Sequence, residues 1–356
     1  MLKDFSPAEF SRAILDWYGQ AGRQLPWRGV LRDPYRIWVS EIMLQQTTVT
    51  AVVGYYERFL QRFPSVEVLA GAALEDVIDQ WAGLGYYSRA RNLHATAQRI
   101  LSEYDGCFPD QVDALQQLPG IGRSTAGAIV ALAFDQRAPI LDANVRRVLC
   151  RMFALQQPPR SAAAEKQLWA WAEELTPERQ VHDYTQGMMD LGALVCLPKA
   201  PLCEECPVSS LCLAQARGLQ HEIPVKLSKK AIPTRAQAVI LLQRGDKLLV
   251  RRRPTTGFLG GLWEFPSVDL EPGTDAEGAV RKWLRQTGFA GDLLFAGTSH
   301  HVYSHFRLES RGYLITLKDN GLVAEDGAEW KSREELTSLA LHGAHKKIFG
   351  KIKEAE

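Results

Sequence analysis

The chain has no long apolar run and almost no net charge, and each absence excludes a class of protein. No segment of its 356 residues reaches the roughly 18 consecutive apolar residues that a membrane-spanning helix needs. The N-terminal segment lacks the apolar core of a signal peptide and instead predicts an amphipathic helix capped by Ser6. We therefore expect a cytoplasmic protein that binds no membrane. With a net charge of +1, any binding to nucleic acid must depend on local basic patches.

Cysteine is also scarce: the sequence has six, and four of them lie between residues 196 and 212. Disulfides are rare in a reducing compartment, so these clustered thiols indicate a metal centre. The predicted ligands, in the spacing C-x6-C-x2-C-x5-C, are Cys196, Cys203, Cys206 and Cys212. This spacing contains one short pair rather than two, which favours a [4Fe–4S] cluster, with zinc as the alternative. We expect the two remaining cysteines, Cys107 and Cys150, to be buried thiols.

The spacing of apolar residues divides the chain into two domains. Residues 1–225 repeat apolar residues at helical spacing between short turns with Pro or Gly, which predicts an all-α domain. The helical spacing extends, for example, over 36–62, 123–134 and 162–175. A linker at 226–235 follows, and residues 236–356 then show the pattern of strands, with one helix near 275–287 and another near the chain's end. The expected fold class is a multidomain protein with an all-α domain and an α+β domain.

Two glycine-bearing turns are candidates for contact with nucleic acid. In LPGIG (118–122), Gly120 and Gly122 allow positive φ and close backbone approach, and we expect backbone N–H groups to bind one phosphate, with Arg123 assisting. A plain helix–helix connection is the alternative. The second turn, GLGYYSRAR (83–91), combines aromatic residues that could wedge into a duplex with arginines that could contact phosphate.

Two carboxylates have the surroundings of an acid–base pair. Glu41 lies in the apolar segment WVSEIMLQQT (38–47), where desolvation would raise its pKa and let it donate a proton near neutral pH. Asp142 precedes a predicted helix, whose N-terminal N–H groups would favour its ionised form. Glycosidic cleavage uses such a pair: the protonated carboxyl group gives a proton to the leaving group, and the ionised carboxylate stabilises the positive charge on the sugar. An exposed glutamate and a simple N-cap are the alternatives.

Four motifs together resemble the helix-hairpin-helix DNA glycosylases that carry a [4Fe–4S] loop. They are LPGIGRSTAG (118–127), LDANVRRV (141–148), the four-cysteine loop and WVSEIMLQQT (38–47). The first three are shared with endonuclease III, whereas the fourth, with GLGYYSRARNLH, is similar to the MutY-type adenine DNA glycosylases. The resemblance covers nearly the whole chain. It implies a monomeric enzyme with a [4Fe–4S] cluster that removes adenine opposite 8-oxoguanine, or more weakly opposite guanine, from duplex DNA.

The resemblance also implies roles for individual residues. Glu41 would protonate the flipped adenine at N7, Asp142 would stabilise the sugar cation, and Asn144 would order the site. Ser124 stands where related lyases carry Lys, and because a hydroxyl forms no Schiff base, the strand should stay intact. The remaining matched positions would contact adenine, the lesion or the DNA: Trp27, Arg28, Gln46, Thr47, Leu84, Tyr86 (as the wedge), Leu118, Gly120, Gly122, Arg123 and Gln186. One departure is Ala143, where the family usually has Gly.

Residues 235–350 resemble the Nudix-like C-terminal domain of the same glycosylases. Its helix has Lys282, Arg285 and Gln286 where Nudix hydrolases have metal-binding carboxylates, so hydrolysis should be absent. The segment HVYSHF (301–306) resembles the family's loop for 8-oxoguanine, with the candidate contacts Tyr303, Ser304 and His305. The basic runs at 251–253 and 229–230 could add phosphate contacts.

Two other functions compete with this interpretation. A bifunctional pyrimidine glycosylase/lyase would need the amine that Ser124 lacks, and a non-catalytic iron–sulfur DNA-binding protein would not need Glu41 and Asp142.

Overall fold

The structure, a computed structural model, describes residues 6–29, 31–226, 232–317 and 327–355. It divides into two compact units. The helical unit comprises Met1–Ala72 and Arg91–Ser228, and the sheet unit comprises Ala73–Ala90 and Lys229–Glu356. The lysines at 229–230, which we expected near phosphate, lie outside the described residues.

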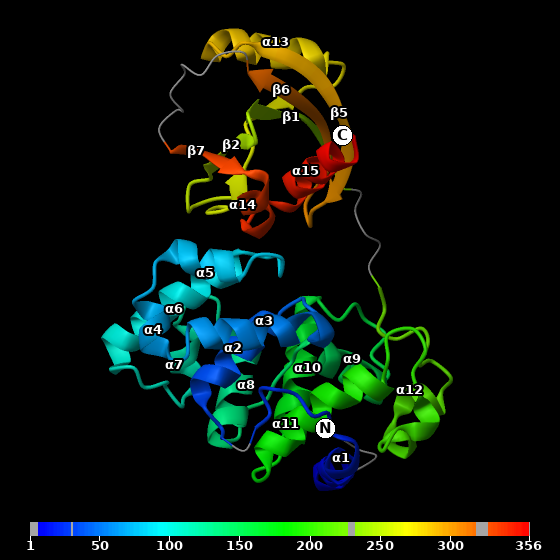
Figure 1. Cartoon of the computed structure of the whole chain (residues 1–356). Coiled ribbons are helices and arrows are strands. Elements are labelled where there is room, and N and C mark those ends of the chain that lie inside the picture. The colour runs from blue at the N-terminus through cyan, green and yellow to red at the C-terminus, as the bar shows by residue number, and fades with distance from the viewer. Residues whose placement is uncertain (1–5, 30, 227–231, 318–326, 356) are drawn as a thin grey trace. The chain divides into compact units, whose positions relative to one another are not determined.

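The helical unit confirms the predicted all-α domain (Figure 1). Its main elements are α1 (Pro7–Ala21), α2 (Pro34–Leu44), α3 (Val49–Arg62), α4 (Val66–Ala70), α6 (Ser88–Tyr104), α7 (Val112–Gln116), α8 (Arg123–Phe134), α9 (Ala143–Met152), α10 (Ala162–Leu175), α11 (Val181–Asp190) and α12 (Leu213–Ala216). The short helical turns η1 (Leu191–Val195), η2 (Cys203–Glu205) and η3 (Ser209–Leu211) belong to the segment around the four cysteines. No helix in the described ranges is both long and apolar enough to span a bilayer.

Local signals explain several of these boundaries. Ser6 accepts a hydrogen bond from the Glu9 N–H and Pro7 begins α1, as the sequence predicted. The apolar periodicity over 36–62, in contrast, does not form one helix, because the chain breaks between α2 and α3. Gln46 adopts a φ of 59° in that break, a conformation that no helix interior allows.

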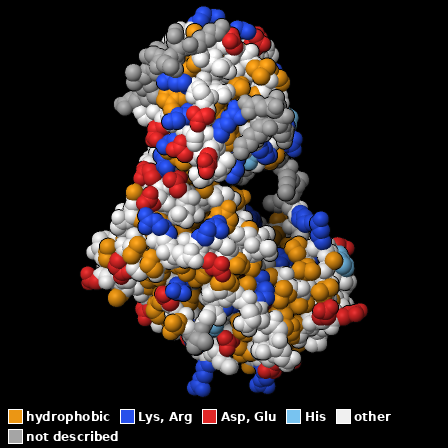
Figure 2. Space-filling model, viewed as in Figure 1, with side chains coloured by type: hydrophobic (Ala, Val, Ile, Leu, Met, Phe, Trp, Pro, Cys, Tyr) orange, Lys and Arg blue, Asp and Glu red, His pale blue; other side chains and the backbone are white. Residues whose placement is uncertain are grey.

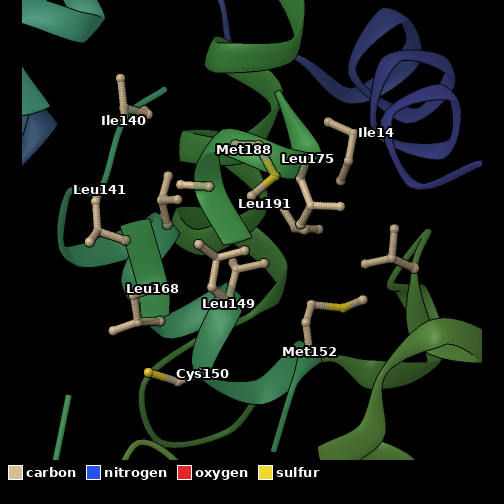
Figure 3. Packing of buried hydrophobic residues seen from close by; sticks show 14 of the residues in the cluster. Ile14, Ile140, Leu141, Leu149, Cys150, Met152, Leu168, Leu175, Met188 and Leu191 are labelled. Carbon is tan, nitrogen blue, oxygen red and sulfur yellow. The ribbon is translucent and has the colours of Figure 1, made fainter. Parts of the chain in front are cut away.

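One buried cluster holds α9, α10 and α11 against α1 (Figure 3). Figure 3 shows Leu149 of α9, Leu168 of α10 and Ile14 of α1 among its side chains. Ile140 and Leu141, directly before Asp142, belong to the same cluster. The backbone that carries Asp142 is therefore anchored in the core.

The sheet unit contains a seven-stranded mixed sheet. The strands are β1 (Thr234–Arg244), β2 (Lys247–Arg252), β3 (Trp263–Glu264), β4 (Ser267–Leu270), β5 (Gly291–Val302), β6 (Arg307–Leu317) and β7 (Ala328–Ser332). The order is β3-β2-β1-β6-β5, with β4 paired to β1, β7 paired to β2, and β1 parallel to β6. The helices of the unit are α5 (Leu74–Gln80), α13 (Ala276–Thr287), α14 (Arg333–Ser338) and α15 (Gly343–Ala355).

Strand β1 is apolar on both sides because helices cover both faces of the sheet (Figure 1). Ile240 and Leu242 share a cluster with Val280 of α13. The alternate residues Val239 and Leu241 pack with Ile348 of α15 on the opposite face. The predicted α+β domain is confirmed; β7 and α14 were not among the predicted elements.

Candidate active site

Asp142 is close enough to Glu41 to influence its ionisation. Glu41 lies on α2, where burial raises its pKa to about 7; the charge of Asp142 raises the pKa further and Arg28 lowers it. Asp142 is the N-cap of α9, and its carboxylate accepts a 2.7 Å hydrogen bond from the Val145 N–H. The expected acid is thus poised to give up a proton near neutral pH.

The electrostatics of Asp142 differ from the prediction. Its cap geometry is as expected, but burial raises the pKa of Asp142 above its ordinary value, even though the N–H groups of Val145 and Asn144 lower it. Desolvation therefore outweighs the helix terminus. Ala143 is the first residue of α9, so its methyl group meets no backbone strain at this position.

Ser124 contacts the backbone rather than a carboxylate. Its Oγ accepts a 3.0 Å hydrogen bond from the N–H of Leu141, the residue before Asp142. Ser124 is the second residue of α8, so this bond links the start of α8 to the start of α9. We infer that Ser124 helps to fix the position of Asp142.

Arg28 is held beside Glu41 by a residue that the sequence analysis missed. Asp190, the last residue of α11, is fully buried and accepts bonds of 2.6 and 2.8 Å from the two terminal nitrogens of Arg28. Arg23 also binds Asp190. Burial opposes ionisation here, but these bonds hold the pKa of Asp190 below its usual range. Asp190 lies 162 residues from Arg28 and 167 residues from Arg23 in the sequence, so no local pattern predicts these ion pairs.

Two buried polar atoms of this region have no hydrogen-bond partner among the described residues: Arg28 Nε and Gln186 Oε1. Gln186 lies one turn before Asp190 on α11, so it shares a helix face with the residue that holds Arg28. One atom is a donor and the other an acceptor, and buried groups of this kind normally have a partner. Trp27, which precedes Arg28, is buried with its ring edge-to-face with Tyr56.

Asn144 is connected to the cysteine segment through Arg147. Asn144 Oδ1 accepts a 2.9 Å bond from Arg147, whose guanidinium also donates to the carbonyl oxygens of Gly192 and Cys196. One turn later, the buried Arg151 donates to Cys196 Sγ at 3.2 Å and to the Leu197 carbonyl at 2.7 Å. Helix α9 thus carries Asp142 at one end and contacts the cysteine segment with the following turns.

The four predicted ligands Cys196, Cys203, Cys206 and Cys212 line one cavity. In the part of the chain that the structure describes, no three His, Cys, Asp or Glu side chains are arranged to hold a single metal ion. The donor set fits an iron–sulfur cluster, because four thiolates are its ligands and the buried Arg151 cation would balance their charge. Cys150 is buried as expected, but Cys107 is exposed, which corrects that prediction.

Of the two glycines in the LPGIG turn, only Gly120 uses the positive φ that both residues allow. Gly120 has a φ of 77°, and a Cβ there would lie 2.8 Å from Asn92 Cβ. Gly122, by contrast, is the N-cap of α8 with a φ of −88°, so it does not need the freedom of glycine. Leu118 is buried beneath the turn. The Arg123 guanidinium lies 3.9 Å from the centroid of the Trp169 ring and 3.7 Å from Glu173 Oε2, so in this structure it contacts α10.

The GLGYY turn, in the sheet unit, presents Tyr86 outward. Tyr86 is 46% exposed and has a φ of 50°, which is unusual for a bulky residue. The carbonyl oxygens of Leu84 and Gly85 accept bonds from the buried Arg89, and Gly85 also accepts from Trp81 Nε1. The turn is internally braced, and Leu84 itself is buried. Gln46 and Thr47 lie in the helical unit, in the break after α2.

The segment 303–306 is the tip of the β5–β6 hairpin. Ser304 and His305 are exposed at this tip, and the Tyr303 N–H donates to the Phe306 carbonyl. Burial raises the pKa of Tyr303 to about 12, and its ring packs against Phe258 and Phe306. The aromatic base of the tip is therefore packed, while Ser304 and His305 face solvent.

Basic side chains do not gather into one patch on the face in Figure 2, where they are scattered among acidic and apolar ones. The arginines at 251–253 are paired with carboxylates: Arg251 and Arg253 with Glu264, and Arg252 with Asp79. The structure thus gives no support to their expected phosphate contacts.

The helical scaffold with its coupled carboxylates and cysteine segment defines a base excision DNA repair protein of the HhH-GPD superfamily, which matches residues 39–174. The NUDIX domain family matches residues 237–351. Among solved structures, a thermostable thymine-DNA glycosylase is 32% identical, with a TM-score of 0.54 over 59% of this chain and 97% of its own. An endonuclease III–DNA covalent intermediate, 22% identical with a TM-score of 0.50 over 60% of this chain and 99% of its own, shares the fold.

Curated relatives define the family more narrowly. The adenine DNA glycosylase of Homo sapiens is 37% identical over 96% of this chain and 73% of its own length. That of Buchnera aphidicola subsp. Acyrthosiphon pisum is 40% identical over 86% of this chain and 87% of its own. The chain belongs to the adenine DNA glycosylase family: it is a base excision repair enzyme that hydrolyses the N-glycosyl bond of adenine.

Proposed function

We propose that this enzyme removes adenine paired with 8-oxoguanine, or more weakly with guanine, from duplex DNA and leaves the strand uncut, acting as a monomer. The observation that carries the adenine site is a pair of buried atoms, Arg28 Nε and Gln186 Oε1, that have no hydrogen-bond partner among the described residues. The charge of Arg28 lowers the pKa of Glu41, so the first of these atoms belongs to a side chain near the proposed acid. Adenine complements them, because its ring nitrogens accept hydrogen bonds and its amino group donates them. An adenine rotated out of the duplex would satisfy both atoms.

The two carboxylates divide the reaction between them. Glu41, whose pKa of about 7 keeps much of it protonated, donates a proton to N7 of adenine. The C1′–N9 bond then breaks, its electron pair leaves with the base, and positive charge develops on the sugar. The Asp142 carboxylate stabilises that charge, and Glu41, now ionised, accepts a proton from the attacking water.

Ser124 explains why the strand would stay intact. A lyase cleaves through an amine that attacks C1′ and forms a Schiff base, and a hydroxyl cannot do this. Ser124 instead accepts a bond from the Leu141 N–H, which supports Asp142. The residue thus serves base excision without offering a nucleophile for strand cleavage.

Recognition of the opposite base is assigned to the sheet unit. The exposed Tyr86 on its braced turn is suited to insert beside the lesion, and Ser304 and His305 at the hairpin tip offer polar groups to its edge. Gln46 and Thr47, in the break after α2, remain candidate contacts to the DNA.

We further propose that Cys196, Cys203, Cys206 and Cys212 hold a [4Fe–4S] cluster. When bound, the cluster would crosslink this segment through four iron–thiolate bonds and take no part in the hydrolysis. The contacts of Arg147 and Arg151 with the segment would then stabilise α9, and with it the position of Asp142.

One assay tests the proposal. Purified enzyme is incubated with duplexes that carry adenine opposite 8-oxoguanine, guanine or thymine, and the products are analysed with and without alkali. We expect free adenine from the first two duplexes, faster from the first, and strand breaks only after alkali. Breaks without alkali would indicate a lyase, and no preference for 8-oxoguanine would contradict the proposed lesion recognition.

A further inference from the structure

Helix α5 and the GLGYY turn pack, within the sheet unit, against residues that lie far from them in the sequence. Ile78 of α5 forms a buried cluster with Leu262 and Ala340. Partly buried side chains surround this cluster: Leu74, Ala82, Tyr87 and Leu259. The segment Ala73–Ala90 is therefore docked on the same unit that carries the hairpin tip.

An ion pair fixes the same docking. Arg252 Nη2 donates to Asp79 Oδ2 at 2.9 Å, and both side chains are largely removed from solvent, with 21% and 34% exposed. The Arg252 guanidinium also lies 4.9 Å from the centroid of the Trp263 ring. Because the ring restricts the guanidinium, the position of Asp79 is set by a prearranged partner rather than by a mobile surface charge.

The contact leaves little room for movement. Gly261 has a φ of 81°, and a Cβ at this position would overlap Ile78 Cδ1, so the Ile78 side chain would have to move. The backbone at Gly261 thus touches the Ile78 side chain directly. A shift of α5 along this surface would open a gap beside a fully buried isoleucine.

Rigid contacts connect α5 to Tyr86. Trp81 directly follows α5, and its Nε1 donates to the Gly85 carbonyl at 3.1 Å. The Arg89 guanidinium binds the carbonyl oxygens of Leu84 and Gly85 from the other side of the turn. The position of α5 on the sheet unit therefore determines where Tyr86 projects.

We infer that Asp79, Arg252 and Ile78 are positioning residues that set the enzyme's preference for the base opposite adenine. They do so by fixing the position of Tyr86 relative to the hairpin tip at 303–306. The inference rests on the proposed function, in which both elements contact that base. If this docking is loosened, adenine excision should proceed, but the enzyme should discriminate less between 8-oxoguanine and guanine.

The test compares single-turnover excision of adenine opposite 8-oxoguanine and opposite guanine, using the full-length enzyme. In Asp79→Asn and Ile78→Val, the ratio of the two rates should fall roughly three- to thirtyfold, with the rate opposite guanine unchanged. Arg252→Gln should lower the same ratio. The double variant Asp79→Arg/Arg252→Asp reverses the pair and should restore most of the ratio.

A matched control removes a different ion pair of the same unit. Glu277 and Arg281 pair at 2.7 Å on α13, so Glu277→Gln should leave the ratio unchanged. Because both substrates are measured on each variant, a general change in stability or DNA affinity would alter both rates together. The melting temperature of each variant identifies such a loss of folding.

Two results would overturn the inference. One is an unchanged ratio in Asp79→Asn and Ile78→Val, and the other is a reversed pair that stays as impaired as its single variants. If the wild-type enzyme itself shows no preference for 8-oxoguanine, the proposed function fails instead, and the two failures are therefore distinguishable.

Discussion

Ser124 Oγ and the backbone N–H of Leu141 are joined by a 3.0 Å hydrogen bond that spans 17 residues of sequence. The bond links α8, which begins at the glycine turn, to the residue before Asp142. A side chain at position 124 therefore lies next to the backbone that carries the proposed stabiliser of the sugar cation.

Replacing this hydroxyl by an amine should change the products. In Ser124→Lys, an amine placed beside Asp142 can attack C1′, so we expect strand cleavage without alkali and a covalent complex with DNA after borohydride reduction. Gel electrophoresis measures both. Ser124→Ala is the control: it should show neither product, and a trapped complex with Ser124→Ala would contradict the role of the amine.

Glu41→Gln should abolish excision while duplex binding is retained, because an amide donates no proton to N7. In the wild-type enzyme the rate should fall as the pH rises through about 7, since the acid form is needed and burial raises the pKa of Glu41 to that value. Single-turnover rates between pH 5 and pH 9 test this, a range of roughly two units on either side of that pKa. A rate that rises steadily over the range would assign the limiting proton transfer to another group.

Asp142→Asn should separate catalysis from folding. Asparagine caps a helix as well as aspartate does, so the melting temperature should stay close to that of the wild-type enzyme. Excision should fall by about 10²–10³-fold, because the negative charge beside the sugar is lost. Asp142→Ala removes the cap as well, and the free energy of unfolding should then drop by about 1 kcal/mol. Full activity in Asp142→Asn would contradict the anionic role.

Asp190→Asn should destabilise the helical unit. The variant leaves the buried Arg28 without its carboxylate partner, and breaking a buried ion pair in this way costs about 3–5 kcal/mol. Denaturant unfolding measures the loss. As a control, Asp33→Asn removes an exposed pair with Arg36 and should change stability by less than about 1 kcal/mol. Equal losses in the free energy of unfolding for the two variants would contradict the stabilising role of the Arg28–Asp190 pair.

Iron content should depend on the clustered cysteines alone. Cys203→Ser should lose most of the bound iron and sulfide, because a four-thiolate site loses one ligand. Cys107→Ser, at an exposed cysteine outside the cluster, should retain both. Zinc without iron in the wild-type protein, determined by elemental analysis, would refute the proposed cofactor.

The sequence by itself determined the two-domain fold class, the boundaries of α8 and α10, and the motifs around Glu41 and Asp142. These features follow from local rules: apolar spacing along a helix, capping at its first residue and turn residues between elements. The α8 helix was predicted at 123–134 and forms there, because its apolar spacing lies within the segment and the glycine turn before it ends at the N-cap, Gly122. Membership of the glycosylase superfamily depended on the same short-range motifs.

Only the tertiary structure determined the partners, the exposure and the ionisation of the residues in these motifs. The partnership of Arg28 with Asp190, the exposure of Cys107, the negative φ at Gly122 and the raised pKa of Asp142 all depend on packing between distant segments. Desolvation is a property of the surrounding fold, so no local pattern predicts it. For the same reason, the sequence placed α5 in the helical domain, whereas its contacts through Ile78 and Asp79 group it with the sheet unit.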